Sequence, residues 1–279
     1  MHRSGTSVLT RGLKALGVYL GETFLDPEPD NPTGYWELKE ILGLNERVME
    51  AIGSPWWSSR QINEDIWESD VLDQQKKRAA SLLAEVFRGR PLWGFKDPRT
   101  IRLFPFWRDV LRGLGPSVSI VLAIRPPLSA ARSLVARPGG PLDDPEALWL
   151  AYMLPRLPEI AKYPVVVVDY DRLIDKPLVQ LRRIASHLGV SLDPAEPEIT
   201  EYTHSFVDVS LRHHVLPRSR TRRGDATSSL AEQAYSALLP LAKRSNEQIR
   251  QASWRRVYEL ARRYRAEASA QREGKRSAA

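Results

Sequence analysis

Two short, predominantly apolar runs constrain the fold of this chain more than any other feature. They are Val118–Ile124 (VSIVLAI) and Val165–Val168 (VVVV), and each is followed by a loop and then a helical pattern. Apolar runs of this length are typical of strands buried on both faces of a parallel sheet. Pro91–Phe95 (PLWGF) is a shorter candidate for a third strand. Strands that alternate with helices predict an α/β fold in which helices flank a parallel sheet.

Helical patterns occupy most of the remaining sequence, and several begin at an aspartate or a proline, as helices often do. The predicted helices are Val8–Leu16, Tyr35–Ile52, Val71–Phe87, Thr100–Leu114, Leu128–Ala136, Pro145–Ala161, Leu178–Leu188 and one or two more within Leu230–Arg263. A chain of 279 residues can bury one large core, and we predict one α/β domain over residues 1–263. Residues 264–279 are polar and charged, so we expect a disordered basic tail there.

The first residues of the chain form a loop that is suited to binding a phosphate group. Residues 2–7 (HRSGTS) precede a helical pattern that starts at Val8. Gly5 lets the backbone approach an anion closely, and the first amides of a helix are unpaired at its positive dipole end. We expect these amides to act together with the side chains of Arg3, Ser4, Thr6 and Ser7. The alternative is an ordinary N-cap turn, and the loop lacks the glycine spacing and lysine of a Walker A motif for ATP.

Phosphate loops of this kind follow a buried strand, but only Met1 and His2 precede this one. The first strand of the expected sheet is therefore missing from the sequence. We expect the natural chain to start upstream of Met1, and the alternative is that this strand is absent from the protein.

The composition limits the classes of function. The formal net charge is +7 and arginine outnumbers lysine more than threefold, which suits polyanionic ligands or membrane surfaces but follows equally from genomic base composition. Nucleic acid is not an expected partner, because the sequence has no basic stripe interleaved with aromatic residues. The chain has no cysteine for disulfides or thiolate zinc sites, and it has no apolar run long enough to span a bilayer. We expect a cytoplasmic protein, with membrane association and oligomeric state left open.

Charged residues follow each predicted strand, at the edge where parallel sheets bind ligands. Lys96 and Asp97 come directly after Pro91–Phe95, and Arg99 follows at a helix start. A lysine at this edge meets an anion or solvent, whereas an aspartate before a proline is typical of an N-cap. We interpret Lys96 as an anion ligand and Asp97 as an N-cap or, alternatively, a functional carboxylate.

The other two strands end in comparable residues. Arg125 follows Val118–Ile124, and Ser133 lies eight residues later, about two turns up the next helix. Both side chains can contact one phosphate group, although an arginine at this place can also pair with a carboxylate. Asp169 follows Val165–Val168, and we interpret it mainly as a structural carboxylate that braces a loop.

Together, these motifs resemble the sulfotransferase family that uses 3′-phosphoadenosine-5′-phosphosulfate (PAPS). The HRSGTS loop resembles the family's 5′-phosphosulfate loop, and Arg125 with Ser133 is similar to the pair that binds the 3′-phosphate. The segment Tyr170–Leu173, with the helical pattern that ends at Gly189, resembles a tyrosine-acid-leucine segment and the helix behind it. The bacterial branch is the most similar, because its members carry HRSGTS, a GYWE-like turn and a GFKDPR segment. The resemblance covers about residues 1–215.

The resemblance implies a P-loop-NTPase-like sulfotransferase fold that transfers a sulfuryl group from PAPS to an acceptor hydroxyl without a metal ion. It also implies that Arg3 and Lys96 stabilise the leaving phosphate and the bridging oxygen. The acceptor is expected to be a carbohydrate, a lipid-linked glycan or another small molecule. The residues assigned to the cofactor are Arg3, Ser4, Gly5, Thr6, Ser7, Arg125, Ser133 and, by a faint match to a C-terminal glycine-rich loop, Arg222 and Arg223.

A sulfotransferase needs a base to take the proton from the acceptor hydroxyl. The histidine base of the cytosolic animal enzymes has no counterpart here. Glu37 is the first choice, because related enzymes with a glutamate base carry it in a similar segment after the phosphate loop. The alternative for Glu37 is a carboxylate favoured by the dipole of a first helical turn. Asp97 is the second choice, and Glu22 and the pair His213–His214 are further candidates.

Two other functions stay open at this point. One is a sulfotransferase-like protein that binds the nucleotide without turnover, which the missing first strand favours. The other is an ATP-dependent P-loop-like kinase. A kinase would need a Walker lysine and a strand-terminal aspartate for magnesium, and neither is convincing in this sequence.

Overall fold

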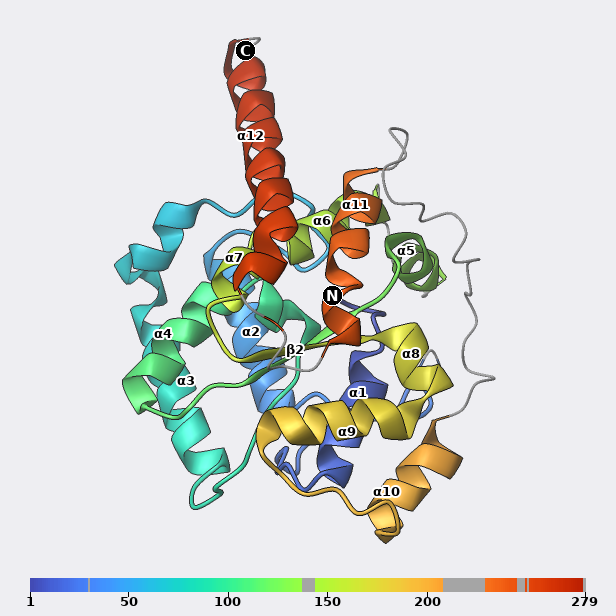
Figure 1. The fold of residues 1–279 in the computed structure, drawn as a ribbon. Coiled ribbons are helices and arrows are strands. Elements are labelled where there is room, and N and C mark those ends of the chain that lie inside the picture. Colours follow the sequence, from blue (N-terminus) through green and yellow to red (C-terminus); the bar gives the residue numbers. More distant parts are fainter. Residues whose placement is uncertain (30, 137–143, 208–228, 245–248, 250, 278–279) are drawn as a thin grey trace.

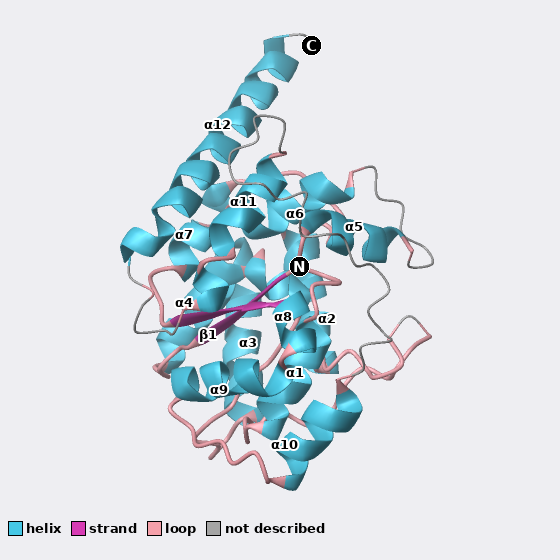
Figure 2. Cartoon of the chain, turned by 45° about the vertical axis from the view of Figure 1, so that its right-hand side comes forward, coloured by secondary structure: helices cyan, strands magenta, loops and turns pink. Residues whose placement is uncertain are grey.

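Two parallel strands lie at the centre of a fold in which helices dominate (Figure 1 and Figure 2). The computed structural model describes residues 1–279 except 30, 137–143, 208–228, 245–248, 250 and 278–279. Strand β1 (Ile120–Ile124) pairs with β2 (Val165–Asp169), with Ile120 opposite Val165 and Ile124 opposite Asp169. The predicted mixed α/β class and the parallel pairing of these two runs are confirmed.

Helices surround this sheet, and their bounds agree with most of the predicted segments. The helices are α1 (Thr6–Ala15), α2 (Lys39–Ala51), α3 (Asp73–Val86), α4 (Phe104–Leu114), α5 (Pro127–Val135), α6 (Pro145–Met153), α7 (Leu157–Ile160), α8 (Tyr170–Asp175), α9 (Pro177–Leu188), α10 (Pro197–Glu201), α11 (Leu230–Leu238) and α12 (Arg255–Ser277). Short 3₁₀ turns lie between several of them, among them η3 (Pro98–Ile101). No described helix is long and apolar enough to cross a membrane.

Strand β2 is buried on both faces, as its unbroken valine run predicts. Side chains alternate across a strand, so Val165 and Val167 join one core cluster while Val166 and Val168 join another. The first cluster contains residues of α6, α7, α11 and α12, and the second contains residues of α1, α9 and α10. Helices therefore cover both faces of the sheet. A third cluster, formed mainly by α2, α3 and α4, completes the core.

The predicted third strand is wrong. Within Pro91–Phe95 only Trp93 forms a bridge, and its partner is Tyr19. Pro91 has no amide to donate to a ladder, and the Trp93 ring instead stacks on Phe87 with 4.4 Å between ring centroids. Sheet pairing of this segment is limited to that one parallel bridge, in which the Tyr19 amide donates to the Leu92 carbonyl oxygen and the Gly94 amide donates to the Tyr19 carbonyl oxygen. Residues 1–5 also contain no strand, so α1 follows the opening loop directly.

Two predicted helical segments are divided differently in the structure. The segment Pro145–Ala161 divides into α6 and α7, because prolines at 155 and 158 interrupt the helical hydrogen bonds. Residues 230–263 contain α11 and the start of α12, and α12 continues to Ser277 through the segment predicted to be a disordered tail. In Figure 1 the end of α12 projects away from the body of the fold. The division into a domain and a tail at residue 263 stays a prediction.

Candidate functional site

Strands β1 and β2 are parallel, so their carboxyl ends meet at one edge of the sheet, and α1 begins at the same edge. Gly5 is the N-cap residue of α1, with φ of 76° and no side-chain capping bond. A Cβ atom on Gly5 would lie 2.1 Å from the Tyr170 ring, so only glycine fits this position. The turn is an N-cap, as the alternative interpretation holds, but the cap is a glycine and no side chain accepts a hydrogen bond from the helix amides. The first amides of α1 have no side-chain acceptor at the N-cap and are suited to bind an anion.

Arg3 connects the opening loop to the end of β1 and to α5. Its Nε donates a hydrogen bond of 2.9 Å to Ser133 Oγ, and Arg125 Nη1 donates one of 2.8 Å to the Arg3 carbonyl oxygen. The Arg125 guanidinium also lies 4.4 Å from the centroid of the Tyr170 ring. Arg3 has φ of 59°, a conformation that non-glycine residues rarely adopt and that is frequent at functional sites. The structure thus brings Arg3, Arg125 and Ser133 into contact with one another.

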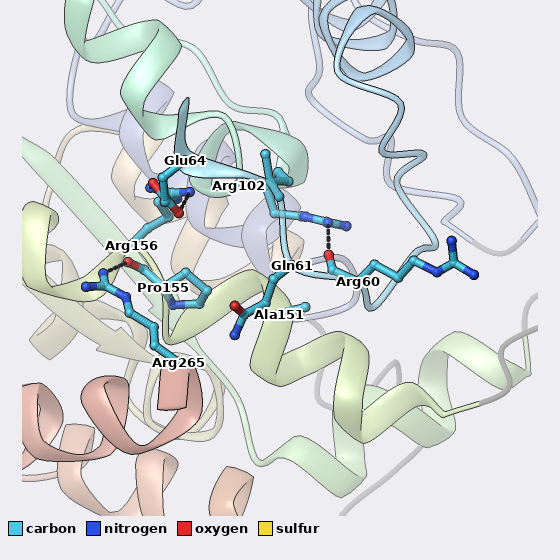
Figure 3. Close-up of a pocket in the computed structure, with 9 residues that line it drawn as sticks. Arg60, Gln61, Glu64, Arg102, Ala151, Pro155, Arg156 and Arg265 are labelled. Atoms are coloured by element: carbon cyan, nitrogen blue, oxygen red, sulfur yellow. Dashed lines mark hydrogen bonds and ion pairs between the residues drawn. The ribbon is translucent and has the colours of Figure 1, made fainter. Parts of the chain in front are cut away.

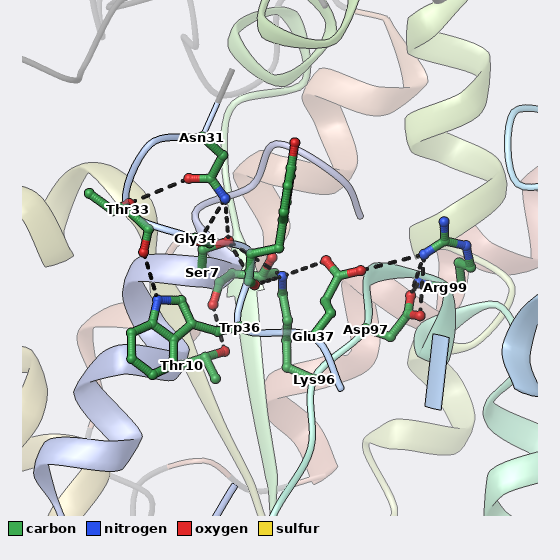
Figure 4. A network of polar contacts seen from close by, with 12 residues as sticks. Ser7, Thr10, Asn31, Thr33, Gly34, Trp36, Glu37, Lys96, Asp97 and Arg99 are labelled. Atoms are coloured by element: carbon green, nitrogen blue, oxygen red, sulfur yellow. Dashed lines mark hydrogen bonds and ion pairs between the residues drawn. The ribbon is translucent and has the colours of Figure 1, made fainter. Parts of the chain in front are cut away.

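Lys96 connects the same loop to Glu37 (Figure 4). Its Nζ lies 2.8 Å from Glu37 Oε1, 2.8 Å from the Tyr35 carbonyl oxygen and 3.4 Å from Ser7 Oγ. Ser7 Oγ itself donates to the Tyr35 carbonyl oxygen at 3.1 Å. Residues from the loop, from the segment before α2 and from the end of the Trp93 segment therefore meet at one ammonium group.

Glu37 lies before α2 rather than in its first turn. Helix α2 begins at Lys39, because Trp36 has φ of 57° and Leu38 is extended, so the predicted start at Tyr35 is wrong. The explanation of Glu37 by the dipole of a first helical turn is consequently wrong as well. The Glu37 side chain is 6% exposed and also lies 3.6 Å from Arg99 Nη1.

Burial opposes charge on both members of the Glu37–Lys96 pair. Burial raises the pKa of Glu37, and the nearby Lys96 opposes this shift. Burial also lowers the pKa of Lys96, against the opposing effect of Glu37. A carboxylate with a raised pKa beside a buried cation is typical of sites that transfer protons.

Asp97 has the capping role that the sequence suggests. It is the N-cap residue of η3, and its Oδ1 accepts a hydrogen bond of 2.7 Å from the Arg99 amide. The same carboxylate binds Arg99 Nη1 at 3.1 and 3.2 Å, and its side chain is fully buried. Because Asp97 is held by Arg99, it is less suited than Glu37 to accept a proton from a substrate.

Asp169 has the structural role that the sequence favours. Its Oδ1 accepts from the Arg172 amide at the start of α8, and its Oδ2 accepts a 2.6 Å hydrogen bond from the Tyr235 hydroxyl. Burial raises the pKa of Asp169, and the Tyr235 hydroxyl opposes that shift. This carboxylate therefore joins the end of β2 to α8 and α11.

The remaining predicted residues lie elsewhere. Glu22 is exposed and accepts from the Tyr19 hydroxyl at 3.2 Å, so it does not contact the Lys96 group. Four residues lie outside the described part of the chain: His213, His214, Arg222 and Arg223. In the described residues, no group of three or more acidic, histidine or cysteine side chains is arranged to hold a metal ion.

Two contacts in the site were not predicted from the sequence. Asn31 Nδ2 donates to the Gly34 carbonyl oxygen at 2.7 Å and lies 3.4 Å from Ser7 Oγ, so it positions the turn before Glu37. The Asn-Pro-x-Gly order of residues 31–34 is a turn signal that could have indicated this. The Tyr170 ring packs against Gly5 and Arg125, and no local sequence pattern indicates that contact.

A scan against protein-family models and a search of curated proteins give no match to this chain.

Proposed function

We propose that this protein is a sulfotransferase that moves a sulfuryl group from PAPS to an acceptor hydroxyl. The observation that carries the proposal is the position of Lys96 Nζ, which lies 3.4 Å from Ser7 Oγ of the opening loop and 2.8 Å from Glu37 Oε1. A cation between an anion-binding loop and a buried carboxylate suits transfer of a charged group to an oxygen that must lose a proton. Within the mixed α/β class, the two parallel strands with α1 at their carboxyl edge support our assignment to a P-loop-like sulfotransferase fold.

The residues present fit a nucleotide with two anionic ends. The start of α1 supplies unpaired amides for one end, because its N-cap is Gly5 without a capping side chain. The second end needs cationic and hydroxyl donors nearby, and Arg125 and Ser133 both contact Arg3 of the loop. The faintly matched Arg222 and Arg223 keep their proposed cofactor role without structural support, since they lie outside the described residues.

PAPS would supply an activated sulfuryl group that needs no metal ion. Lys96 and Arg3 would stabilise negative charge that develops on the oxygen between the sulfuryl group and the 5′-phosphate. Glu37 would accept the proton of the acceptor hydroxyl, because its raised pKa makes it a stronger base than an ordinary carboxylate. Asp97 would act indirectly, by holding Arg99 beside Glu37. A carbohydrate, lipid-linked glycan or other small hydroxyl compound is the proposed acceptor class.

Isothermal titration with 3′,5′-adenosine bisphosphate, with ATP as the comparison, tests the cofactor class. We expect micromolar binding of the bisphosphate and much weaker binding of ATP. Arg125→Ala should weaken bisphosphate binding by about tenfold or more, because it removes a charged contact to a phosphate. Tighter binding of ATP would favour the kinase alternative, and no binding of either nucleotide would contradict the proposal.

Transfer of labelled sulfate from PAPS to a panel of hydroxyl compounds tests turnover. Binding of the bisphosphate together with transfer supports an enzyme. Binding without transfer to any acceptor would instead favour a nucleotide-binding protein that has lost turnover.

A further inference from the structure

A pocket on another part of the molecule is lined by arginines from four separate segments (Figure 3). Arg60 comes from the loop before η1 (Glu64–Glu68), Arg102 follows η3, Arg156 precedes α7, and Arg265 belongs to α12. Glu64 is the single acidic residue that lines this arginine pocket. The lining therefore has a strong excess of positive charge.

Arg102 is deeply buried, with 2% exposure. Its Nη2 donates to Ser54 Oγ at 2.9 Å and to the Arg60 carbonyl oxygen at 3.0 Å, and its Nη1 donates to the Ser58 carbonyl oxygen. In the part of the chain that the structure describes, Arg102 forms no ion pair and its Nε has no hydrogen-bond partner. Burial lowers the pKa of Arg102, the neighbouring Tyr152 hydroxyl opposes this shift, and the charge of Arg156 adds a smaller lowering effect. A buried guanidinium without a counter-ion is costly, so an anion at this place would be stabilising.

The other three arginines are neutralised to different degrees. Arg156 is buried and pairs with Glu64 at 2.7 Å and with Glu159 at 3.0 Å. Arg265 Nη2 donates to the Pro155 carbonyl oxygen at 2.8 Å, which fixes the guanidinium at the pocket without neutralising it. Arg60 is exposed and lines the same pocket, and its guanidinium is drawn at the edge of the group in Figure 3.

We propose that the arginine pocket binds a tetrahedral oxyanion, either free phosphate or sulfate or the same group in a monoester. Guanidinium groups are suited to phosphate and sulfate because they donate two parallel hydrogen bonds. The arginines come from four separate segments of the chain, and the positive charge that they bring to one pocket suits an anion. The proposal does not depend on the proposed sulfuryl transfer.

Arg102 of the pocket and His2 of the opening loop both lie beside the ring of Tyr152. The Arg102 guanidinium lies 5.1 Å from the centroid of the Tyr152 ring, and the His2 ring lies 5.8 Å from the same ring. Tyr152 also donates a 2.7 Å hydrogen bond to the Trp56 carbonyl oxygen, in the segment that leads to Arg60. The arginine pocket is therefore a neighbour of the loop and has its own set of ligands.

Isothermal titration with inorganic sulfate and inorganic phosphate in Tris buffer tests the proposal. The variants are Arg60→Glu and Arg265→Glu, with Arg88→Glu as the matched control, because Arg88 is exposed and does not line the pocket. All three variants change the net charge equally and leave the opening loop unchanged. We expect about tenfold or weaker anion binding in each pocket variant and unchanged binding in Arg88→Glu. Thermal unfolding of each variant establishes that it is folded.

Equal anion affinity in the pocket variants and the control would overturn the proposal, since the anion would then bind elsewhere. Absence of millimolar binding by the natural sequence would also overturn it. Titration with glucose 6-phosphate separates the two sources of the anion. Tighter binding of the ester than of inorganic phosphate identifies an esterified ligand, and tighter binding of inorganic phosphate identifies the free ion.

Discussion

Glu37 and Lys96 illustrate how burial changes the chemistry of single residues. Desolvation favours the neutral form of each group, while their contact at 2.8 Å favours the charged forms. Burial dominates for Glu37, whose pKa is raised. The groups that face Glu37 are Lys96 and Arg99, with Asp97 behind Arg99. A proton can therefore move to and from Glu37 closer to neutral pH than from an exposed glutamate.

Glu37→Gln tests this role. It keeps the shape of the side chain but removes the base, so kcat for sulfate transfer should fall about 10²–10⁴-fold while affinity for 3′,5′-adenosine bisphosphate changes little. Glu40→Gln is the matched control, because Glu40 is partly exposed and its side chain accepts from the Thr23 hydroxyl at 2.6 Å. Full activity of Glu37→Gln would transfer the role of the base to Asp97.

The pH dependence gives an independent measurement of the same role. A base must be deprotonated to act, so kcat/KM should rise with pH through a pKa above that of an ordinary glutamate. This acidic limb should disappear in Glu37→Gln and persist in Glu40→Gln. An identical limb in both variants would assign it to another group.

Two features of the structure require glycine at position 5, its positive φ and the close approach of the Tyr170 ring, and substitutions can separate them. Alanine at Gly5 would adopt an unfavourable φ of 76° and place Cβ 2.1 Å from the Tyr170 ring. Gly17→Ala is the matched control, since Gly17 has φ of 82° and open space around it. We expect Gly17→Ala to cost about 1–2 kcal/mol from backbone conformation alone. Gly5→Ala should cost more and should weaken bisphosphate binding, as measured by urea unfolding and titration. Equal effects of the two variants would mean that the Tyr170 contact adjusts freely.

At the scale of elements, the end of β2 depends on a hydrogen bond from α11. Tyr235→Phe removes the 2.6 Å bond to Asp169 Oδ2, which leaves a buried carboxylate with one partner fewer. We expect a loss of about 1–3 kcal/mol in the free energy of unfolding at neutral pH. Tyr258→Phe is the control, because its hydroxyl contacts Gln251 at an exposed position.

The sign of the pH effect follows from the Asp169 pKa. The Tyr235 hydroxyl stabilises the ionised carboxylate, so its removal should raise the already raised pKa of Asp169 further. The difference in stability between Tyr235→Phe and the natural sequence should therefore shrink as pH falls and Asp169 becomes protonated in both proteins. A difference that is constant with pH would show that the hydroxyl does not act through the Asp169 charge.

Elements were predictable where local pattern and packing agree. The valine run of β2 predicts burial on both faces, and the structure places alternate valines in two core clusters. The strand predicted at Pro91–Phe95 is wrong because apolar aromatic residues are equally suited to packing against helices, as the Trp93 ring does on Phe87. For the site, the residue types at and after the strand ends indicated Lys96, Arg125 and Ser133. Which residues contact each other was not predictable, because Arg3 and its partner Ser133 lie 130 positions apart and leave no local signal. Long-range contacts of this kind require the fold.

At the scale of the whole molecule, α12 connects the end of the chain to the centre of the fold. Its first turns belong to the core cluster on one face of the sheet, through Val257 and Leu260. Farther along, Tyr264 packs against that cluster, and its carbonyl oxygen lies 3.4 Å from Gln61 Nε2. Arg265 then reaches the Pro155 carbonyl oxygen. These contacts extend beyond residue 263, where the sequence predicted the domain to end.

Two truncations locate the end of the folded unit. A chain ending at residue 270 keeps Tyr264 and Arg265, so its Tm should equal that of the full chain. A chain ending at residue 263 loses the partly buried Tyr264 ring and both hydrogen bonds, a loss of about 2 kcal/mol that corresponds to roughly 4–8 °C in Tm. Thermal unfolding of the three proteins at one concentration measures this directly. Equal Tm values for all three would support the predicted boundary at residue 263, because the contacts of Tyr264 and Arg265 would then add nothing to the stability of the fold.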